Sequence, residues 1–168
     1  MKQRIVISGL GGQGVLFLTR VLAEAALQGG HEVITSETHG MAQRGGSVIS
    51  TVKVGPFHGP LIAPGEADVG LFLVADNLPV HGHYLKPGGI AFVNAAEAVG
   101  PASVDAATLA AAAGSPRSVN LVLLGFAAGR GGLFGLPAAF EAAIRAVTPA
   151  RFLEKNLQAF STGVGAAR

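Results

Sequence analysis

Arg4-Ile5-Val6-Ile7-Ser8-Gly9-Leu10-Gly11-Gly12-Gln13-Gly14 is the stretch that decides the fold of this chain. Its first half is short, apolar and β-branched and runs directly into a glycine cluster, which predicts a buried strand that ends in a tight turn. From Val15 to Leu27 apolar residues recur at helical spacing, so a largely buried helix should follow, and Gly29-Gly30 should end it. Glu32 to Glu37 predicts a second strand, which completes a strand-helix-strand unit.

The rest of the chain continues the alternation of strands and helices. Ser47 to Val54 is rich in β-formers, although its direction in a sheet stays open. Buried strands are predicted at Val69 to Val74 and Ile90 to Asn94, and helices at Ala106 to Ala113, Val119 to Ala128, Pro137 to Val147 and Pro149 to Phe160, with a tail from Ser161 that frays or docks on a partner. We therefore predict the α/β class: one Rossmann-like three-layer domain over residues 1–168, with a mostly parallel sheet and a helical C-terminal half.

The composition indicates that a partner chain covers part of the surface. Hydrophobic residues make up 49% of the 168 residues and charged residues 13%, with a mean hydropathy of +0.48. Soluble domains carry about 25% charged residues and rarely expose large apolar patches. The alternative is a compact monomer in which abundant alanine and glycine raise the hydrophobic share without adding much apolar area.

Several classes of function are disfavoured by residue usage. The chain has no cysteine, so it offers no thiolate for an iron–sulfur cluster, no catalytic thiol and no disulfide. Its basic residues are scattered, and it has one tyrosine and no tryptophan, so we expect no nucleic-acid partner. Because no apolar run approaches ~18 residues and the first residues lack the pattern of a signal peptide, we expect a cytoplasmic protein with no membrane partner.

The glycine cluster is the first candidate binding site. It has the form G-x-G-x-x-G after a predicted strand and before a predicted helix, where backbone N–H groups and the helix dipole can hold a phosphate or carboxylate. The candidate cofactor-binding residues here are Gly9, Gly11, Gly12, Gln13 and Gly14. The alternative is that these glycines merely permit a sharp turn and close helix–strand packing.

A second candidate binding site is the polar stretch Glu37-Thr38-His39-Gly40-Met41-Ala42-Gln43-Arg44-Gly45-Gly46-Ser47. Two glycines follow Arg44, so its guanidinium can approach a phosphate or carboxylate without crowding. The candidate cofactor-binding residues are His39, Gln43, Arg44, Gly45 and Gly46. The alternative is that Arg44 pairs with a carboxylate across a subunit interface while His39 caps the loop.

Other polar residues indicate no chemistry of their own. His81-Gly82-His83 has no evident third ligand, so we expect a solvated loop and no metal site. Ser8 and Ser47 lack a histidine and an acid at the positions that serine hydrolases use. We therefore assign no catalytic residue to this chain.

The two glycine-framed clusters, taken together, resemble the two signatures of the gamma-type subunit of 2-oxoacid:ferredoxin oxidoreductases, the pyruvate/ketoisovalerate oxidoreductase gamma family. The stretch His39 to Ser47 is most similar to the indolepyruvate oxidoreductase beta subunit branch. The resemblance continues through most of the chain, at Gly65 to Val69, Tyr84 to Gly89, Val93-Asn94 and Asn120 to Gly125.

The resemblance implies an accessory subunit of an enzyme complex. Partner subunits would carry thiamine diphosphate and the iron–sulfur clusters, oxidatively decarboxylate a 2-oxoacid to an acyl-CoA, and pass electrons to ferredoxin or another acceptor. An aryl 2-oxoacid such as indolepyruvate or phenylglyoxylate is the substrate that this branch suggests. The chain would bind no cofactor alone, would be inactive in isolation, and would contribute coenzyme A handling at the interface and assembly.

Two rival hypotheses come from the residues. In the first, the chain is a free-standing NAD- or FAD-binding protein in which the Gly9–Gly14 loop holds a pyrophosphate and Glu37 holds a ribose hydroxyl. In the second, it is a structural interface module that binds no small molecule.

Overall fold

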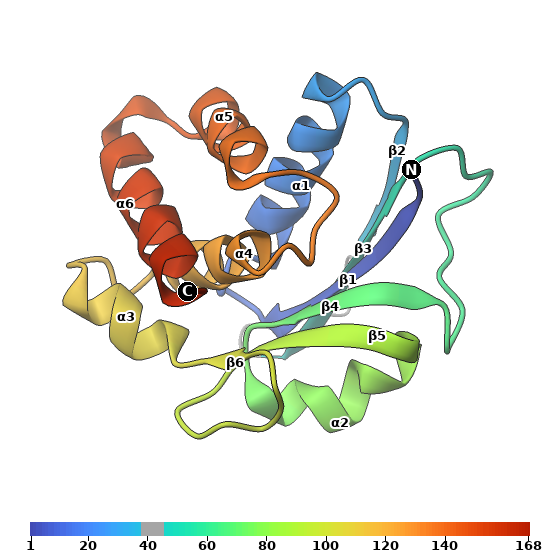
Figure 1. Ribbon diagram of the computed structural model, residues 1–168, viewed down its shortest axis with the longest axis horizontal. Coiled ribbons are helices and arrows are strands. Elements are labelled where there is room, and N and C mark those ends of the chain that lie inside the picture. The colour runs from blue at the N-terminus through green and yellow to red at the C-terminus, as the bar shows by residue number, and fades with distance from the viewer. Residues whose placement is uncertain (38–45) are drawn as a thin grey trace.

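The computed structural model, which describes residues 1–37 and 46–168, has six strands in one sheet with the order β2-β3-β1-β4-β5-β6 (Figure 1). The strands are β1 (Gln3–Leu10), β2 (Val33–Glu37), β3 (Ser47–Val54), β4 (Ala67–Phe72), β5 (Leu85–Asn94) and β6 (Ser103–Val104). The pairs β1–β4, β4–β5 and β5–β6 are parallel, and β3 is antiparallel to both of its neighbours. The predicted α/β class with a mostly parallel sheet is confirmed.

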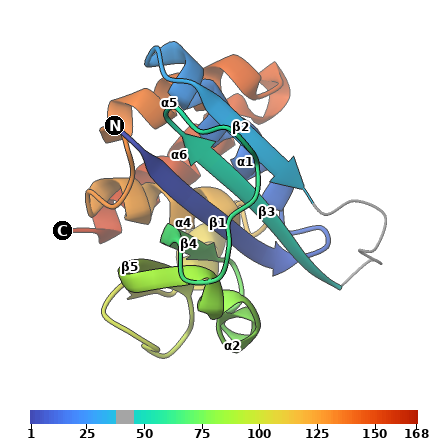
Figure 2. The ribbon, with the colours of Figure 1, turned by 90° about the vertical axis from the view of Figure 1, so that its right-hand side faces the viewer.

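Strand β3 lies between the two strands of the predicted strand-helix-strand unit. Its Thr51 pairs with Val6 of β1 on one side and with Ser36 of β2 on the other. Figure 2 shows β2, β3 and β1 side by side in this order. Neighbouring strands are about 4.8 Å apart, so β2 lies roughly 10 Å from β1 instead of next to it. Glu37, at the end of β2, is therefore one strand further from the glycine cluster than in a dinucleotide-binding unit.

Helices lie on both faces of the sheet, as the three-layer prediction requires (Figure 1). One face carries α1 (Val15–Gln28), α4 (Val119–Gly129), α5 (Pro137–Val147) and α6 (Ala150–Ala166), and the other carries α2 (Leu78–His81) between two short 3-10 turns, η1 (Ala75–Asn77) and η2 (Gly82–Tyr84). Helix α3 (Ala106–Ala112) packs against α4 and α6. No helix among the described residues is long and apolar enough to cross a membrane.

Helix α4 is the centre of the helical layer. Every residue from Asn120 to Ala128 is buried, because α4 packs against the sheet, α3 and α6 at once. Such a helix needs apolar residues on all sides, so part of the hydrophobic excess serves the chain's own core. Large side chains nevertheless remain open to solvent, with Leu61 77% and Leu136 79% exposed.

The C-terminal tail does not fray, contrary to one of the two predicted alternatives. Residues 161–166 continue helix α6, which packs on α4. Gly163 is buried, and its missing side chain lets the two helices touch backbone to backbone. The sequence pattern hid this contact because glycine lowers the predicted helix propensity and adds no apolar signal.

Candidate functional site

The glycine cluster forms the turn between strand β1 and helix α1. Gly12 has φ 90°, and Gly14, the N-cap of α1, has φ 83°. Residues other than glycine rarely adopt this region of backbone conformation. The Gln13 side chain closes the turn, since its Oε1 accepts a hydrogen bond of 2.7 Å from the backbone N–H of Leu10. The strand therefore enters the helix through a rigid loop that Gln13 braces.

Two of the predicted glycines are explained by packing. A side chain at Gly9 would place its Cβ 2.9 Å from both Gln13 Oε1 and Val15 Cγ2. At Gly14 the Cβ would collide with the Nδ2 atom of Asn120, which reaches from the first turn of α4. These contacts support the alternative interpretation for Gly9 and Gly14, in which glycine permits the turn and the close packing.

Gly12, in contrast, has open space around it. Apart from its chain neighbours, no atom of residues 1–37 and 46–168 lies within 4 Å of the position that its Cβ would occupy. Gly12 and Gln13 line a cavity of about 440 Å³, which we call the loop cavity, together with Leu73, Pro116, Arg117 and Val119. The N–H groups of Gly12 and Gly14 make no hydrogen bond within residues 1–37 and 46–168. Free amides at a helix N-terminus beside the cationic Arg117 form a geometry suited to an anion.

One residue of the second candidate cluster is placed beside the first. The backbone N–H of Gly11 donates a hydrogen bond of 2.9 Å to the carbonyl of Gly46. The end of the second cluster therefore meets the glycine loop at the same edge of the sheet. The other candidates of that cluster, namely His39, Gln43, Arg44 and Gly45, lie outside the described residues.

A polar network that the sequence did not predict supports the loop from the opposite side. Asn77 Nδ2 donates to Gly9 O at 2.9 Å and to Ser8 Oγ at 3.0 Å, and Ser47 Oγ donates to Asn77 Oδ1 at 3.3 Å. Ser8 Oγ lies 2.7 Å from Nδ1 of His81 on α2. Because Ser8 Oγ already accepts from Asn77, its own hydrogen is available for His81 Nδ1. The prediction of a solvated loop was therefore wrong for His81.

The electrostatics of His81 agree with this hydrogen bond. Burial lowers the pKa of its imidazole below the ordinary value of 6.5, and the neighbouring His83 lowers the pKa further. A neutral imidazole can accept at Nδ1 from Ser8, whereas a protonated ring would lose this acceptor. Around this pair the described residues contain no group of three or more His, Asp or Glu side chains that could hold a metal ion.

We expect the His81→Asn variant to lose less stability than the wild type when the pH falls from 7.5 to 5. The pKa of His81 is lower in the folded chain than in the unfolded chain, where it has the ordinary value of 6.5. As the pH falls below 6.5, the unfolded chain is therefore protonated first. The contribution of His81 to wild-type stability is complete above pH 6.5 and is lost as the pH falls towards the folded pKa. Asparagine keeps an acceptor near Ser8 but does not titrate. Urea unfolding at several pH values measures the difference.

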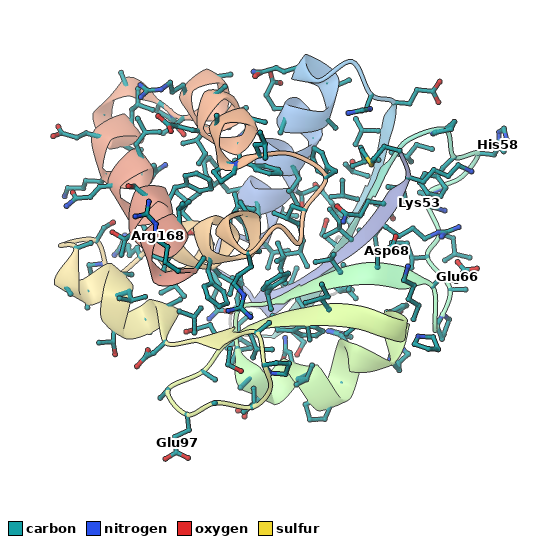
Figure 3. All side chains as sticks on the ribbon, in the orientation of Figure 1. Lys53, His58, Glu66, Asp68, Glu97 and Arg168 are labelled. Atoms are coloured by element: carbon teal, nitrogen blue, oxygen red, sulfur yellow. The ribbon has the colours of Figure 1, made fainter. Side chains whose placement is uncertain are left out.

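The control for this experiment is His58→Asn. His58 is an exposed histidine on the connection between β3 and β4, on the side of the molecule away from the helices (Figure 3). This variant should keep the wild-type dependence of stability on pH. Identical pH profiles for His81→Asn and the wild type would contradict the role assigned to His81.

Asn120 and Arg117 are the site residues that sequence reasoning missed. Asn120 is 6% exposed, and its Nδ2 donates to Gly14 O at 3.3 Å, which ties the start of α4 to the N-cap of α1. A single polar residue inside the apolar run from Val119 to Ala128 was the available signal. Arg117 gave no such signal, because folding alone brings it to the glycine loop.

The fold and the site together define an α/β domain whose glycine loop joins the first strand to the first helix and which contains no thiol. Comparison with known proteins makes this assignment narrower. The family model described as pyruvate ferredoxin/flavodoxin oxidoreductase matches residues 4–166, and the chain belongs to this family. Within the family it is a gamma-type domain of the 2-oxoacid oxidoreductases.

Three relatives illustrate the match. The indolepyruvate oxidoreductase subunit IorB of Archaeoglobus fulgidus is 31% identical over 99% of this chain and 96% of its own length. The gamma subunit of a keto/oxoacid ferredoxin oxidoreductase from Geobacter sulfurreducens has a TM-score of 0.78 at 27% identity and is covered to 98%, as is this chain. The 2-oxoglutarate:ferredoxin oxidoreductase of Magnetococcus marinus has the same fold, with a TM-score of 0.79 at 20% identity over 99% of this chain and 31% of that chain.

Proposed function

We propose that this chain is the accessory subunit of a 2-oxoacid:acceptor oxidoreductase that acts on an aryl 2-oxoacid such as indolepyruvate, and that its glycine loop binds the phosphates of coenzyme A at the interface with the partner subunits. The observation that carries the proposal is the open side of Gly12. There Arg117 and Gly12, whose backbone amide makes no hydrogen bond within residues 1–37 and 46–168, both line the loop cavity. The similarity to indolepyruvate oxidoreductase subunits supports the choice of substrate.

The residues at the loop fit a phosphate ester. Gly12 has no side chain that would hold a pyrophosphate away from the amides, and the dipole of α1 favours negative charge at this point. The loop cavity, at about 440 Å³, is within the usual size of small-molecule sites, roughly 300–1,000 Å³. The Magnetococcus marinus enzyme, whose longer chain includes this fold, was solved with coenzyme A bound.

The rest of the reaction falls to partner subunits in this proposal. Thiamine diphosphate would supply decarboxylation, and iron–sulfur clusters would pass electrons to ferredoxin or another acceptor. This chain has no cysteine that could ligate such a cluster. Its own part is to hold the phosphate end of coenzyme A and to dock on the partner, and we propose a cytoplasmic location for the complex.

The position of β3 weighs against the dinucleotide rival. That hypothesis needs Glu37 at the end of a strand adjacent to β1, where it reaches the ribose of a nucleotide held by the glycine loop. In this fold the antiparallel strand β3 separates the two strands. A pyrophosphate at the loop would therefore lack the acid that a dinucleotide fold supplies from the neighbouring strand.

Ligand titration of the isolated chain and of the reconstituted complex tests the proposal. We expect coenzyme A to bind and NAD and FAD not to bind, and we expect copurification with a chain that carries thiamine diphosphate.

Gly12→Val should weaken coenzyme A binding about tenfold, because its side chain fills the open side of the loop. The matched control is Gly65→Val in the β3–β4 connection, which adds the same side chain at a glycine with φ 83° and equally open surroundings. Tight binding of NAD or FAD in place of coenzyme A would favour the dinucleotide rival.

We expect Arg44→Ala to reduce the activity of the reconstituted complex, by about tenfold or more, while the melting temperature of the isolated chain changes by less than about 2 °C. The reason is its sequence setting, where two glycines leave a guanidinium free to meet an anion. Steady-state kinetics at varied coenzyme A and a thermal melt measure the two effects. Full activity of the mutant complex would show that Arg44 is not part of the proposed site.

A further inference from the structure

A second hollow, distinct from the loop cavity, opens between α1, the α3–α4 connection and the start of α6. It has a volume of about 700 Å³, and we call it the helical groove. Its walls come from three parts of the chain that are far apart in sequence: Phe17 and Arg20 of α1, residues 114–118 before α4, and Phe152 and Lys155 of α6. It meets the loop cavity at Pro116 and Arg117, which line both.

The charged residues that line the helical groove are all cationic. Arg20, Arg117 and Lys155 line it, and no aspartate or glutamate does. All three cationic side chains are exposed, and within the described part of the chain none of them makes an ion pair or a side-chain hydrogen bond. Ion pairs do form elsewhere on the surface, between Lys86 and Asp68 and between Arg145 and Glu141. The charged side chains that line the groove are therefore all cationic, which favours an anion there.

The same groove is lined by apolar rings and side chains. Phe17 and Phe152 contribute their rings, Leu121 and Val147 contribute aliphatic surface, and Phe152 is 47% exposed. The guanidinium of Arg151, which does not itself line the groove, lies 4.6 Å from the ring centroid of Phe152. Small-molecule sites typically combine such an apolar lining with a few charged groups that fix orientation.

We propose that the helical groove binds an organic anion, with a planar apolar body against Phe17 and Phe152 and a carboxylate or phosphate near Arg20, Arg117 and Lys155. This site goes beyond the proposed function, because Gly12 and Gln13 do not line it, although it shares Pro116 and Arg117 with the loop cavity. Two sources share this chemistry: an aryl carboxylate and a nucleoside phosphate. An acidic protein segment is a different class of partner, and its binding in place of small anions would overturn the proposal.

Calorimetric titration of the full chain with four probes tests the proposal and separates the two sources. Indole-3-acetate and its uncharged counterpart indole represent the aryl carboxylate, and adenosine 5′-phosphate and adenosine represent the nucleoside phosphate. We expect at least one of the two anions to bind about tenfold more tightly than its uncharged counterpart, with an affinity that falls as salt is raised. The anion that binds identifies the source. Absence of binding by both anions, or equal affinity for charged and uncharged probes, would overturn the proposal.

Substitutions assign the binding to the groove. Lys155→Glu should weaken anion binding about tenfold or more, and Phe152→Ala should weaken it several-fold for every probe that binds. Both side chains are exposed, so the variants should fold, and neither residue lines the loop cavity. The charge-matched control is Arg168→Glu at the exposed C-terminus, a residue that Figure 3 labels. Arg168 follows the end of α6, and the rise of a helix places it roughly 20 Å from Lys155. Equal losses in Lys155→Glu and Arg168→Glu would reduce the effect to net charge and overturn the proposal.

The same variants keep this inference separate from the coenzyme A proposal. Gly12→Val alters the glycine loop and should leave binding of the groove probe unchanged, whereas Lys155→Glu should weaken it about tenfold or more. If coenzyme A fails to bind while an organic anion still depends on Lys155, the proposed function fails and the groove site stands. If the anion depends on Gly12 and not on Lys155, the groove site fails.

Discussion

Replacing Gly163 with alanine is expected to lower the free energy of unfolding by about 2–4 kcal/mol, even though the same change in an exposed helix raises stability. The new Cβ would overlap the carbonyl oxygen of Val122 on α4 and would lie 2.8 Å from the backbone nitrogen of Phe126. Both are backbone atoms of a buried helix, so neither can move away as the flexible end of a side chain could. Helices α4 and α6 would have to separate along their contact.

A matched control lies two residues further along the same helix. Gly165 is also in α6, but outside the neighbouring backbone of that helix no atom of the described residues lies within 4 Å of the position of its Cβ. Gly165→Ala should therefore raise the free energy of unfolding by up to about 1 kcal/mol, the usual gain in a helix. Urea unfolding of the two variants at equal protein concentration gives opposite signs if the helices touch backbone to backbone. A neutral Gly163→Ala variant would show that α6 does not pack on α4 at this distance.

Gly14→Ala is the second substitution with a large expected effect, a loss of about 2–4 kcal/mol in the free energy of unfolding. Two causes act together. Gly14 has φ 83°, which strains any residue with a side chain, and its Cβ would collide with the amide of Asn120. Because this contact fixes the N-terminus of α1 against α4, the variant should also disturb the loop cavity.

Two further variants separate strain from collision. Gly12→Ala has the same kind of backbone strain, with φ 90°, but open space around its Cβ, so it should cost only about 1–2 kcal/mol. Adding Asn120→Ala to Gly14→Ala removes the atom that the new Cβ would strike, and the double variant should be more stable than the sum of the single losses predicts. Strict additivity would show that collision with Asn120 contributes nothing.

The sequence predicted the elements of the fold better than their arrangement. The bounds of α5 agree with the predicted Pro137 to Val147, and α1 and α4 differ from the prediction by one residue at their ends. These helices follow from apolar periodicity and from breaks at glycine and proline, which are local signals. The strand predicted from Ile90 begins earlier, because β5 starts at Leu85 and passes an irregularity before Ile90.

The site was predicted in part for the same reason. The glycine loop was found because strand, glycine cluster and helix are consecutive in the chain. Asn77, His81 and Arg117 were not found as parts of it, because each comes from a different segment and reaches the loop only through folding. Their residue types carry no signal of function in isolation.

By itself, the sequence determined the class of the fold, the turn after the first strand, the absence of thiols and the family signatures, because each depends on residues that are neighbours in the chain. Only the tertiary structure decided that β3 separates β2 from β1, that Gly9 and Gly14 are packing positions while Gly12 is open, and that α6 lies against α4 through Gly163. Glycines look alike in a sequence. What surrounds each missing side chain depends on which distant backbone comes to lie beside it, and that is settled when the whole core packs.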